Sequence, residues 1–413
     1  MNTLVQTIGR FRAGSPAGLN PRVVGGAVVA LVLGAALLGD AFGWRQAALY
    51  GLGGALGVVL YHASFGFTSA WRVFLSDRRG AGLRAQMLML GLASLLFLPA
   101  LAEGSLFGRQ IIGAVAPLSV SLLVGAFVFG AGMQLGGGCA SGTLFTAGGG
   151  NSRMWITLAA FIAGSVIATQ HVPWWFAQPG LSSISLVRDY GLPAALLGQL
   201  AVFGLIYAVT IVAERRRHGR LIRRENGDVQ GWRRLLRGPW PLVWGAVGLA
   251  GLNFATLAVA GHPWGITYGF TLWGAKIASA IGIDVGSWEF WTWGYHKNAL
   301  ASSVFANSTS VMNFGILAGA LLAAGLAGKF APVRVWRLPL RSIVGAVIGG
   351  LLMGYGARLA FGCNIGAYFS GIASSSVHGW VWFVMAMLGS GLGTFLRPVF
   401  GLEVERTPRD TGC

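Results

Sequence analysis

The chain has 413 residues, of which 54% are hydrophobic and only 10% are charged. Because soluble globular proteins carry about 25% charged residues, this composition excludes a soluble protein and indicates a membrane protein. The formal net charge of +18 would suit nucleic-acid binding, but nine arginines lie in one stretch, residues 214–240, between two apolar segments. We therefore interpret the positive charge as a topological signal and as a contact with anionic lipid, without nucleic acid as a partner.

About ten apolar segments approach the roughly 20 helical residues that cross a bilayer. They are predicted at residues 23–43, 46–62, 85–103, 111–136, 153–171, 190–213, 240–260, 310–328, 342–360 and 379–398. The expected fold is an all-α polytopic membrane protein. With the basic segments in the cytoplasm, alternate loops satisfy the positive-inside rule, and both termini are expected to be cytoplasmic. The first segment is too long for a signal-peptide core and is expected to be a retained span.

Two segments far apart in the chain resemble each other around a cysteine. The stretches "GMQLGGGCASGTLF" (132–145) and "GARLAFGCNIGAYF" (356–369) share six of fourteen positions, and one shared position pairs Cys139 with Cys363. The pairing carries weight because the chain holds only three cysteines. The expected topology makes the preceding spans run in opposite directions. The sequence therefore predicts an inverted-topology repeat, an architecture typical of transporters and channels.

A weaker match pairs "FGFT" (65–68) with "WGIT" (264–267) and extends the repeat toward its beginning. The predicted parts of the chain are an N-terminal segment with the first helix (1–45), a first inverted repeat (46–213), a basic cytoplasmic loop (214–239), a second inverted repeat (240–400) and a C-terminal tail (401–413). The topology of 265–305 stays open: its charged residues lie either in an external vestibule or in a further membrane segment. These charged residues are Lys276, Asp284 and Glu289.

The glycines around each cysteine predict a break in the helix followed by a short re-entrant helix. Each thiol would then lie at a half-helix N-terminus, where free N–H groups and the helix dipole attract an anion without a fixed positive side chain. A neutral, polarizable thiol favours an anion with a terminal sulfur over sulfate, whereas a thiolate would repel a dianion. The predicted substrate-binding residues are Cys139, Cys363, Gly138, Ala140, Ser141, Gly362, Asn364 and Ile365.

These blocks, with "FGFTSAWR" (65–72) and the hydropathy profile, resemble the YeeE/YedE family of sulfur-compound transporters over about residues 46–398. The resemblance implies an hourglass of inverted repeats in which central thiols, here Cys139 and Cys363, pass thiosulfate by S–H···S hydrogen bonds. The family often has a further cysteine in its first block. The predicted pathway entrance at that place consists of Phe65, Gly66 and Phe67 and holds no thiol. This departure leaves another sulfur or selenium species open as the substrate.

Two classes of function remain. The first is a bacterial inner-membrane permease for a small sulfur-containing anion, with a cytoplasmic sulfur-accepting protein as a candidate partner. The second is a membrane-bound sulfurtransferase that forms a cysteine persulfide. It is less favoured because no His, Asp or Glu, which could act as a base, lies within ten residues of Cys139. A water- or formate-type channel would leave the thiols unexplained. No cofactor is expected, and no CxxC motif or His–Cys spacing indicates a metal site.

The other notable residues are expected to have structural roles. Cys413 ends a polar tail, and His378 is expected to be packed rather than to carry protons. Arg72 is expected to end its small helix and to reach the cytoplasmic interface. An aromatic belt at the membrane interface is predicted from Trp174, Trp175, Trp288, Trp291 and Trp293.

Overall fold

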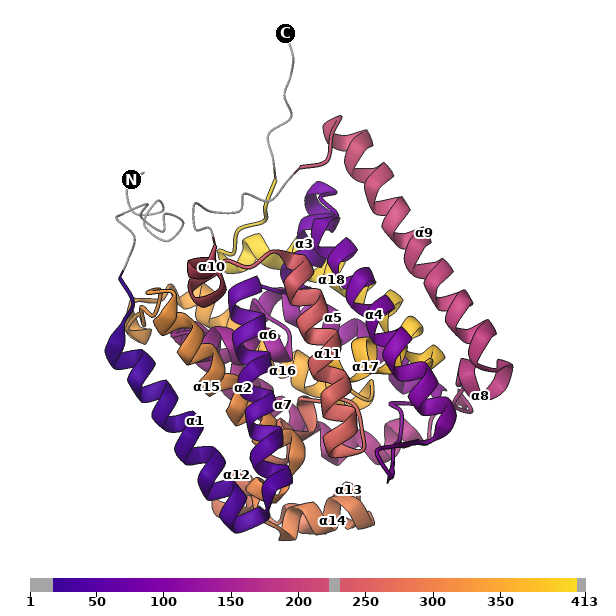
Figure 1. Ribbon diagram of the computed structural model, residues 1–413. Coiled ribbons are helices and arrows are strands. Elements are labelled where there is room, and N and C mark those ends of the chain that lie inside the picture. Colours follow the sequence, from indigo (N-terminus) through magenta and orange to yellow (C-terminus); the bar gives the residue numbers. More distant parts are fainter. Residues whose placement is uncertain (1–17, 223–230, 407–413) are drawn as a thin grey trace.

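The computed structural model describes residues 18–222 and 231–406, which are almost entirely helical (Figure 1). The helices before residue 223 are α1 (Pro21–Phe42), α2 (Trp44–Ala63), α3 (Phe67–Asp77), α4 (Ala81–Glu103), α5 (Val120–Gly136), α6 (Ala140–Gly148), α7 (Ser152–Phe176), α8 (Leu186–Tyr190) and α9 (Leu192–His218). Those after residue 230 are α10 (Trp232–Arg237), α11 (Leu242–Ala260), α12 (Thr267–Ala280), α13 (Glu289–Thr292), α14 (Gly294–Ala301), α15 (Ser308–Leu326), α16 (Leu340–Leu359), α17 (Ser370–Ala373) and α18 (Val377–Leu396).

Shorter elements connect these helices. They are a π-helical turn, η5 (Asn364–Phe369), and the 3-10 turns η2 (Val285–Ser287), η3 (Val304–Ala306), η4 (Val335–Arg337) and η6 (Arg397–Phe400). The strands are β1 (Ser105–Leu106), which pairs antiparallel with β2 (Arg109–Gln110), and β3 (Leu118–Ser119), which pairs antiparallel with β4 (Gly180–Leu181).

Ten helical segments of the described chain are long and apolar enough to cross a membrane, so the predicted all-α polytopic fold is confirmed. The fourth predicted span, 111–136, differs most from the structure. Its helix begins only at Val120, because Ser119 accepts the N–H of Leu122 as an N-cap and Pro117 lacks an N–H for the preceding turn.

The segment 265–305 does not form a full span. Its longest helix, α12, has 14 residues and rises only about 21 Å, against about 30 Å for a bilayer core. The short helices α13 and α14 follow at the lower end of the molecule in Figure 1. Asp284 and Glu289 are exposed there, and none of the ion pairs among the described residues joins them to Lys276.

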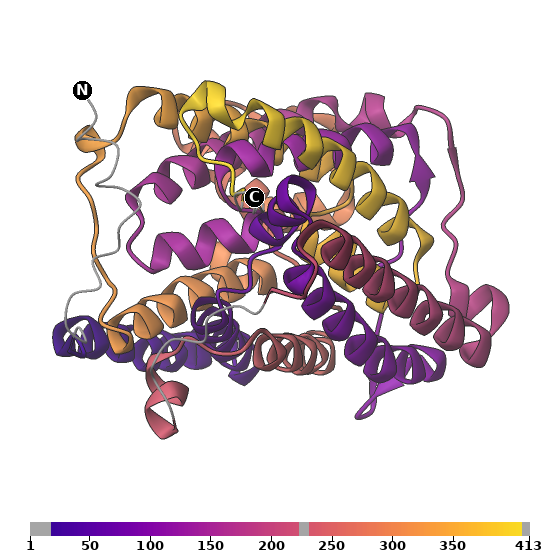
Figure 2. The same ribbon diagram turned by 90° about the horizontal axis from the view of Figure 1, so that it is seen from above.

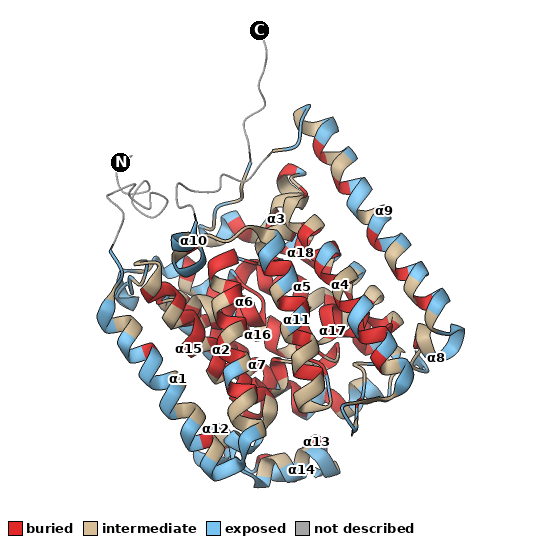
Figure 3. Ribbon diagram, viewed as in Figure 1, coloured by how far each residue is buried: buried red, intermediate tan, exposed pale blue. Residues whose placement is uncertain are grey.

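The two halves of the chain repeat one order of elements. In chain order, the corresponding pairs are α2 and α11, α3 and α12, α4 and α15, α5 and α16, α6 and the combined η5–α17, and α7 and α18. Their contacts correspond too: α2 packs on α15 as α11 packs on α4, and α7 packs on α16 as α18 packs on α5. This matched packing supports the predicted inverted repeat, which we retain as a proposal. Helices α1 and α9 are largely exposed and lie on opposite sides of the molecule (Figures 1, 2 and 3).

Two of the corresponding pairs of helices run antiparallel. At one end of the α2–α11 pair, the Trp240 N–H donates to the His62 carbonyl over 2.8 Å. At the other end, the Arg45 guanidinium reaches the Val259 carbonyl over 3.4 Å. The α5–α16 pair is antiparallel as well, since the Ser121 hydroxyl near the start of α5 donates to the carbonyl of the last residue of α16. Opposite directions of corresponding helices are what an inverted repeat requires.

Glycines allow these helices to approach closely. A Cβ on Gly389 of α18 would overlap the Phe127 carbonyl of α5, and one on Gly130 of α5 would overlap the Ala386 carbonyl of α18. Gly164 of α7 similarly contacts the Leu351 carbonyl of α16. The hydrophobic effect does not drive helices together inside a membrane. Small residues promote association there because they let the backbones approach closely and increase van der Waals contact.

The basic helix ends gather at one end of the molecule, at the top of Figure 1. There the last turn of α9 carries three arginines, and α10 and the start of α16 add others. If this end is cytoplasmic, trypsin should cleave the 214–238 segment only when it acts on the cytoplasmic face of sealed vesicles. Arg188 and Lys297, at the other end, should show the opposite sidedness. Cleavage of 214–238 from the outside would invert the topology.

Candidate functional site

The first cysteine lies in a break between α5 and α6. Gly137 takes a left-handed backbone with φ 89°, which turns the chain at the end of α5. Cys139 is then the extended N-cap of α6, and its carbonyl accepts the Thr143 N–H over 2.7 Å. Its thiol is 1% exposed and lies 3.3 Å from the Ser141 hydroxyl. The predicted short helix after a break is therefore present at this cysteine.

The second cysteine repeats this arrangement after α16. Phe361 and Gly362 take positive φ values of 58° and 148°, and Cys363 follows as the extended N-cap of η5. Its sulfur accepts the N–H of Ile365 over 3.4 Å, and the side chain is fully buried. The helix that follows begins as a π-helical turn and continues into α17, a winding that often occurs at functional sites.

The two cysteine segments meet inside the molecule. Helix α6 contacts η5, and the thiols lie close enough to interact electrostatically. The N-terminus of α3 joins them: the Thr68 hydroxyl lies beside the Cys139 thiol, and the Phe67 ring packs edge-on against Tyr368 of η5 with centroids 6.1 Å apart. The N-termini of α3, α6 and η5 thus lie close to one another, and helix N-termini attract negative charge.

This centre holds buried polar groups that lack partners. Both amide atoms of Asn364 and the hydroxyls of Thr68 and Thr143 make no hydrogen bond of good geometry with the described residues. Such groups have donors and acceptors that a ligand or water can use. A Cβ on Gly366 would meet no atom within 4 Å, and one on Gly142 only the Cys139 sulfur at 3.6 Å. The space beside these two glycines, each three residues after a cysteine, is therefore only loosely filled.

The eight predicted substrate-binding residues occupy these two breaks. Gly138 and Gly362 pack directly against the helices that follow them, and their contact with a substrate stays a prediction. At the predicted entrance, Phe65 and Gly66 line a separate pocket of about 280 Å³, whereas Phe67 is fully buried. No group of three His, Cys, Asp or Glu side chains in the described ranges could hold a metal ion.

The sequence predicted an anion site without a fixed positive side chain, but an arginine lies in the neighbourhood of the second cysteine. Arg358, near the end of α16, lies within electrostatic reach of Cys363. Its guanidinium donates to the Thr267 hydroxyl over 3.2 Å and lies 5.9 Å from the centre of the Tyr268 ring. A lone charge in an apolar span, five residues before the cysteine, is itself a sequence signal of function that the motif comparison did not use.

Arg72 also differs from its prediction. It lies in the middle of α3, which continues to Asp77, and is only 8% exposed. Its guanidinium forms a bidentate ion pair with Glu405, at 2.6 and 2.7 Å, and contacts the Gln134 amide. The chain segment that ends at residue 406 reaches the middle of the molecule in the view from above (Figure 2). A residue from the C-terminal segment therefore neutralises Arg72.

Two other expectations have different outcomes. His378 is packed as predicted, 2% exposed and bonded through Nδ1 to the Ser376 hydroxyl. Trp291 does not belong to an interfacial belt, because it is buried and donates to the Thr169 hydroxyl. Cys413 lies outside the described residues.

Known proteins resemble the chain across this site. The Sulphur transport family matches residues 62–392. Proteins named probable transporter YedE, from Escherichia coli (strain K12) and Salmonella typhimurium, are 34% and 35% identical over 150 residues, and the match spans only 36% of each of them and of this chain. A protein named thiosulfate transporter TsuA, from Spirochaeta thermophila, is 29% identical over 350 residues, which are 82% of this chain and 95% of that protein.

The family match includes α3, both cysteine breaks and most of the helices that surround them. It extends from the end of α2 into α18, so it covers both halves of the proposed repeat. The chain therefore belongs to the Sulphur transport family, the YeeE/YedE family of multi-pass membrane proteins that its two cysteine blocks resemble.

Proposed function

We propose that the chain is an inner-membrane permease for a small sulfur-containing anion, thiosulfate, which passes Cys139 and Cys363. The observation that carries the proposal is the buried centre in which two thiols, three helix N-termini and the unpartnered Asn364 amide meet. The relatives named thiosulfate transporter support this class of substrate. The basic end is assigned to the cytoplasm, where a sulfur-accepting protein is a candidate partner.

The chemistry of the centre suits a transient complex with thiosulfate. A neutral thiol donates a weak hydrogen bond to the terminal sulfur, and helix N–H groups and the Asn364 amide are available for the oxygens. Cys139 and Cys363 contribute to this complex as neutral hydrogen-bond donors and carry no charge. Because each of these contacts is modest, the anion can enter and leave, as conduction requires.

The sulfurtransferase alternative fits this centre less well. Persulfide formation needs a thiolate and a base that removes the thiol proton. The groups bonded to the two sulfurs are the Ser141 hydroxyl and the Ile365 N–H. Neither accepts a proton at neutral pH. A trapped cysteine adduct, detected by mass spectrometry after incubation with thiosulfate, would nevertheless favour this alternative.

Uptake by proteoliposomes tests the substrate. Unlabelled thiosulfate should compete with labelled thiosulfate roughly tenfold better than sulfate does, since sulfate has the same charge but lacks the soft sulfur, a difference of about one hydrogen bond. Sulfite and selenium analogues in the same assay address the other candidate substrates. Equal competition by sulfate would mean that the site recognises charge alone and that the cysteines only pack.

A further inference from the structure

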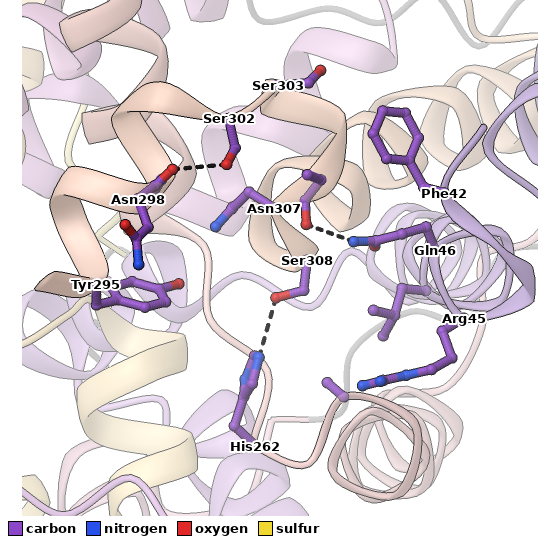
Figure 4. A pocket seen from close by; sticks show the side chains of 14 residues that line it. Phe42, Arg45, Gln46, His262, Tyr295, Asn298, Ser302, Ser303, Asn307 and Ser308 are labelled. Atoms are coloured by element: carbon purple, nitrogen blue, oxygen red, sulfur yellow. Dashed lines mark hydrogen bonds between the residues drawn. The ribbon is translucent and has the colours of Figure 1, made fainter.

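An open pocket lies at the α14 end of the molecule (Figure 4). It has a volume of about 480 Å³ and lies between the start of α2, α14 and the start of α15. Arg45 lines it, and the Nε atom of Arg45 has no hydrogen-bond partner among the described residues. His262, Asn307 and Tyr295 also line it, so its wall contains several polar groups and one positive charge.

A continuous series of side chains leads from this pocket to the thiol centre. The Tyr295 ring, in the pocket wall, packs against the Tyr268 ring with centroids 5.3 Å apart. Arg358 lies over the Tyr268 ring, and it contacts Thr267 at the N-terminus of α12. Cys363 follows within electrostatic reach. Arg358 therefore stands between the open pocket and the second cysteine.

Arg358 is a cation without a counter-ion. It takes part in no ion pair among residues 18–222 and 231–406, and its buried Nε has no hydrogen-bond partner there. The neighbouring His296 does not add a second positive charge at neutral pH, because burial and the nearby Arg358 lower the pKa of His296 to about 4. A partly buried guanidinium in a membrane protein, with an unpartnered donor, is suited to bind an anion.

We propose that Arg358 forms a second anion site, in which its guanidinium binds the oxygens of a small dianion before that anion reaches Cys363. The site recognises charge and oxygen geometry, because a guanidinium forms bidentate hydrogen bonds with oxyanions and has no preference for sulfur. This proposal rests on the proposed function in one respect: the natural ligand of the Arg358 site is taken to be the transported anion.

The matching position in the first half supports a special role for Arg358. Gln134 stands there, and it donates to the Thr68 carbonyl, as Arg358 donates to the hydroxyl of the corresponding Thr267. Two arginines contact Gln134: Arg72, which Glu405 neutralises, and Arg397, whose guanidinium donates to the Gln134 carbonyl. Arg153 and Arg397, on the Cys139 side, also take part in no ion pair among the described residues, but their guanidiniums donate to backbone carbonyls, whereas the Nε of Arg358 has no hydrogen-bond partner there.

Equilibrium dialysis of the purified full-length protein in detergent tests this site with labelled thiosulfate and labelled sulfate as separate probes. Arg358→Gln installs the side chain of the matching position and should weaken the binding of both anions by roughly tenfold or more. Arg358→Lys keeps the charge but loses the planar fork, so its loss should be smaller. Arg188→Gln, which removes an exposed arginine at the same end, should bind both anions as the parent does.

Uptake by proteoliposomes separates binding from a structural role. Arg358→Gln should raise the half-saturating thiosulfate concentration and leave the preference for thiosulfate over sulfate unchanged, whereas a folding defect would lower only the amount of active protein. If folded Arg358→Gln binds both anions as tightly as the parent protein does, the proposal is wrong. If Arg358→Gln does not fold, the same result in Arg358→Lys would overturn it. A parent protein that binds anions through Arg358 but transports none would refute the proposed function and leave this site standing.

Discussion

Replacing Cys139 or Cys363 by alanine should lower thiosulfate uptake roughly ten- to a hundredfold. Each substitution removes the only thiol in its half of the centre, and the backbone N–H groups and Asn364 stay in place. The lost interaction is a hydrogen bond of about 1–3 kcal/mol, which has this effect on the rate if it stabilises the anion at the barrier. The measurement is the initial rate of labelled thiosulfate entry into proteoliposomes, normalised to inserted protein.

Serine at the same positions distinguishes the mechanisms. A hydroxyl keeps a donor of similar size but is harder and better hydrated, so transport by the serine variants should fall between those of cysteine and alanine. In a persulfide enzyme serine would be as inactive as alanine. Cys413→Ala, in the C-terminal tail, is the matched thiol control and should transport at the parent rate. If Cys139→Ala and Cys363→Ala fold and both transport thiosulfate at the parent rate, the two thiols only pack and do not bind the substrate.

Gly389→Ala should strongly destabilise the protein. The added Cβ would overlap the Phe127 carbonyl of α5, and a backbone atom in a packed helix cannot rotate away as a side chain can. Overpacking of this kind costs typically 1–3 kcal/mol and occasionally more, and we expect roughly 3 kcal/mol here. The effect can be measured as a lower thermal unfolding midpoint in detergent and a smaller monodisperse fraction in gel filtration.

The same helix provides the control. Gly391 lies two residues further along α18, and a Cβ there would meet no atom within 4 Å. Gly391→Ala should therefore be neutral or stabilising, because alanine favours a helix over glycine by about 1 kcal/mol. Equal stability of the two variants would mean that α5 and α18 do not approach as closely as described.

Much of the fold follows from local sequence properties. The spans were predictable because long apolar runs satisfy the bilayer without any knowledge of their neighbours. The two cysteine breaks were predictable because glycine and cysteine recur together in a chain with few cysteines. The late start of α5 was missed because the apolar run continues through 111–119, and the N-cap formed by Ser119 was not weighed against it.

Contacts between residues far apart in the chain could not be predicted from the sequence. The Arg72–Glu405 ion pair joins residues 333 positions apart, and no periodicity indicates such a pairing. The spacing of Arg358 and Cys363 in the sequence suggests that they lie near each other. Whether Arg358 has a counter-ion depends on the side chains of every neighbouring helix, which the sequence does not place. The burial of Trp291 likewise depends on Thr169 in α7, so composition alone placed this residue wrongly at the interface.

The crosswise packing of the two halves limits how the protein can move. Because α5 contacts both α16 and α18, and α2 lies along α15, each half is enclosed by helices of the other. Rocking one half as a rigid body would separate the glycine contacts of several pairs at the same time, including those of Gly130 and Gly389. Alternating access through large rotations is therefore disfavoured. We therefore expect the short helices and side chains around the centre to move during transport, while the long helices stay in place.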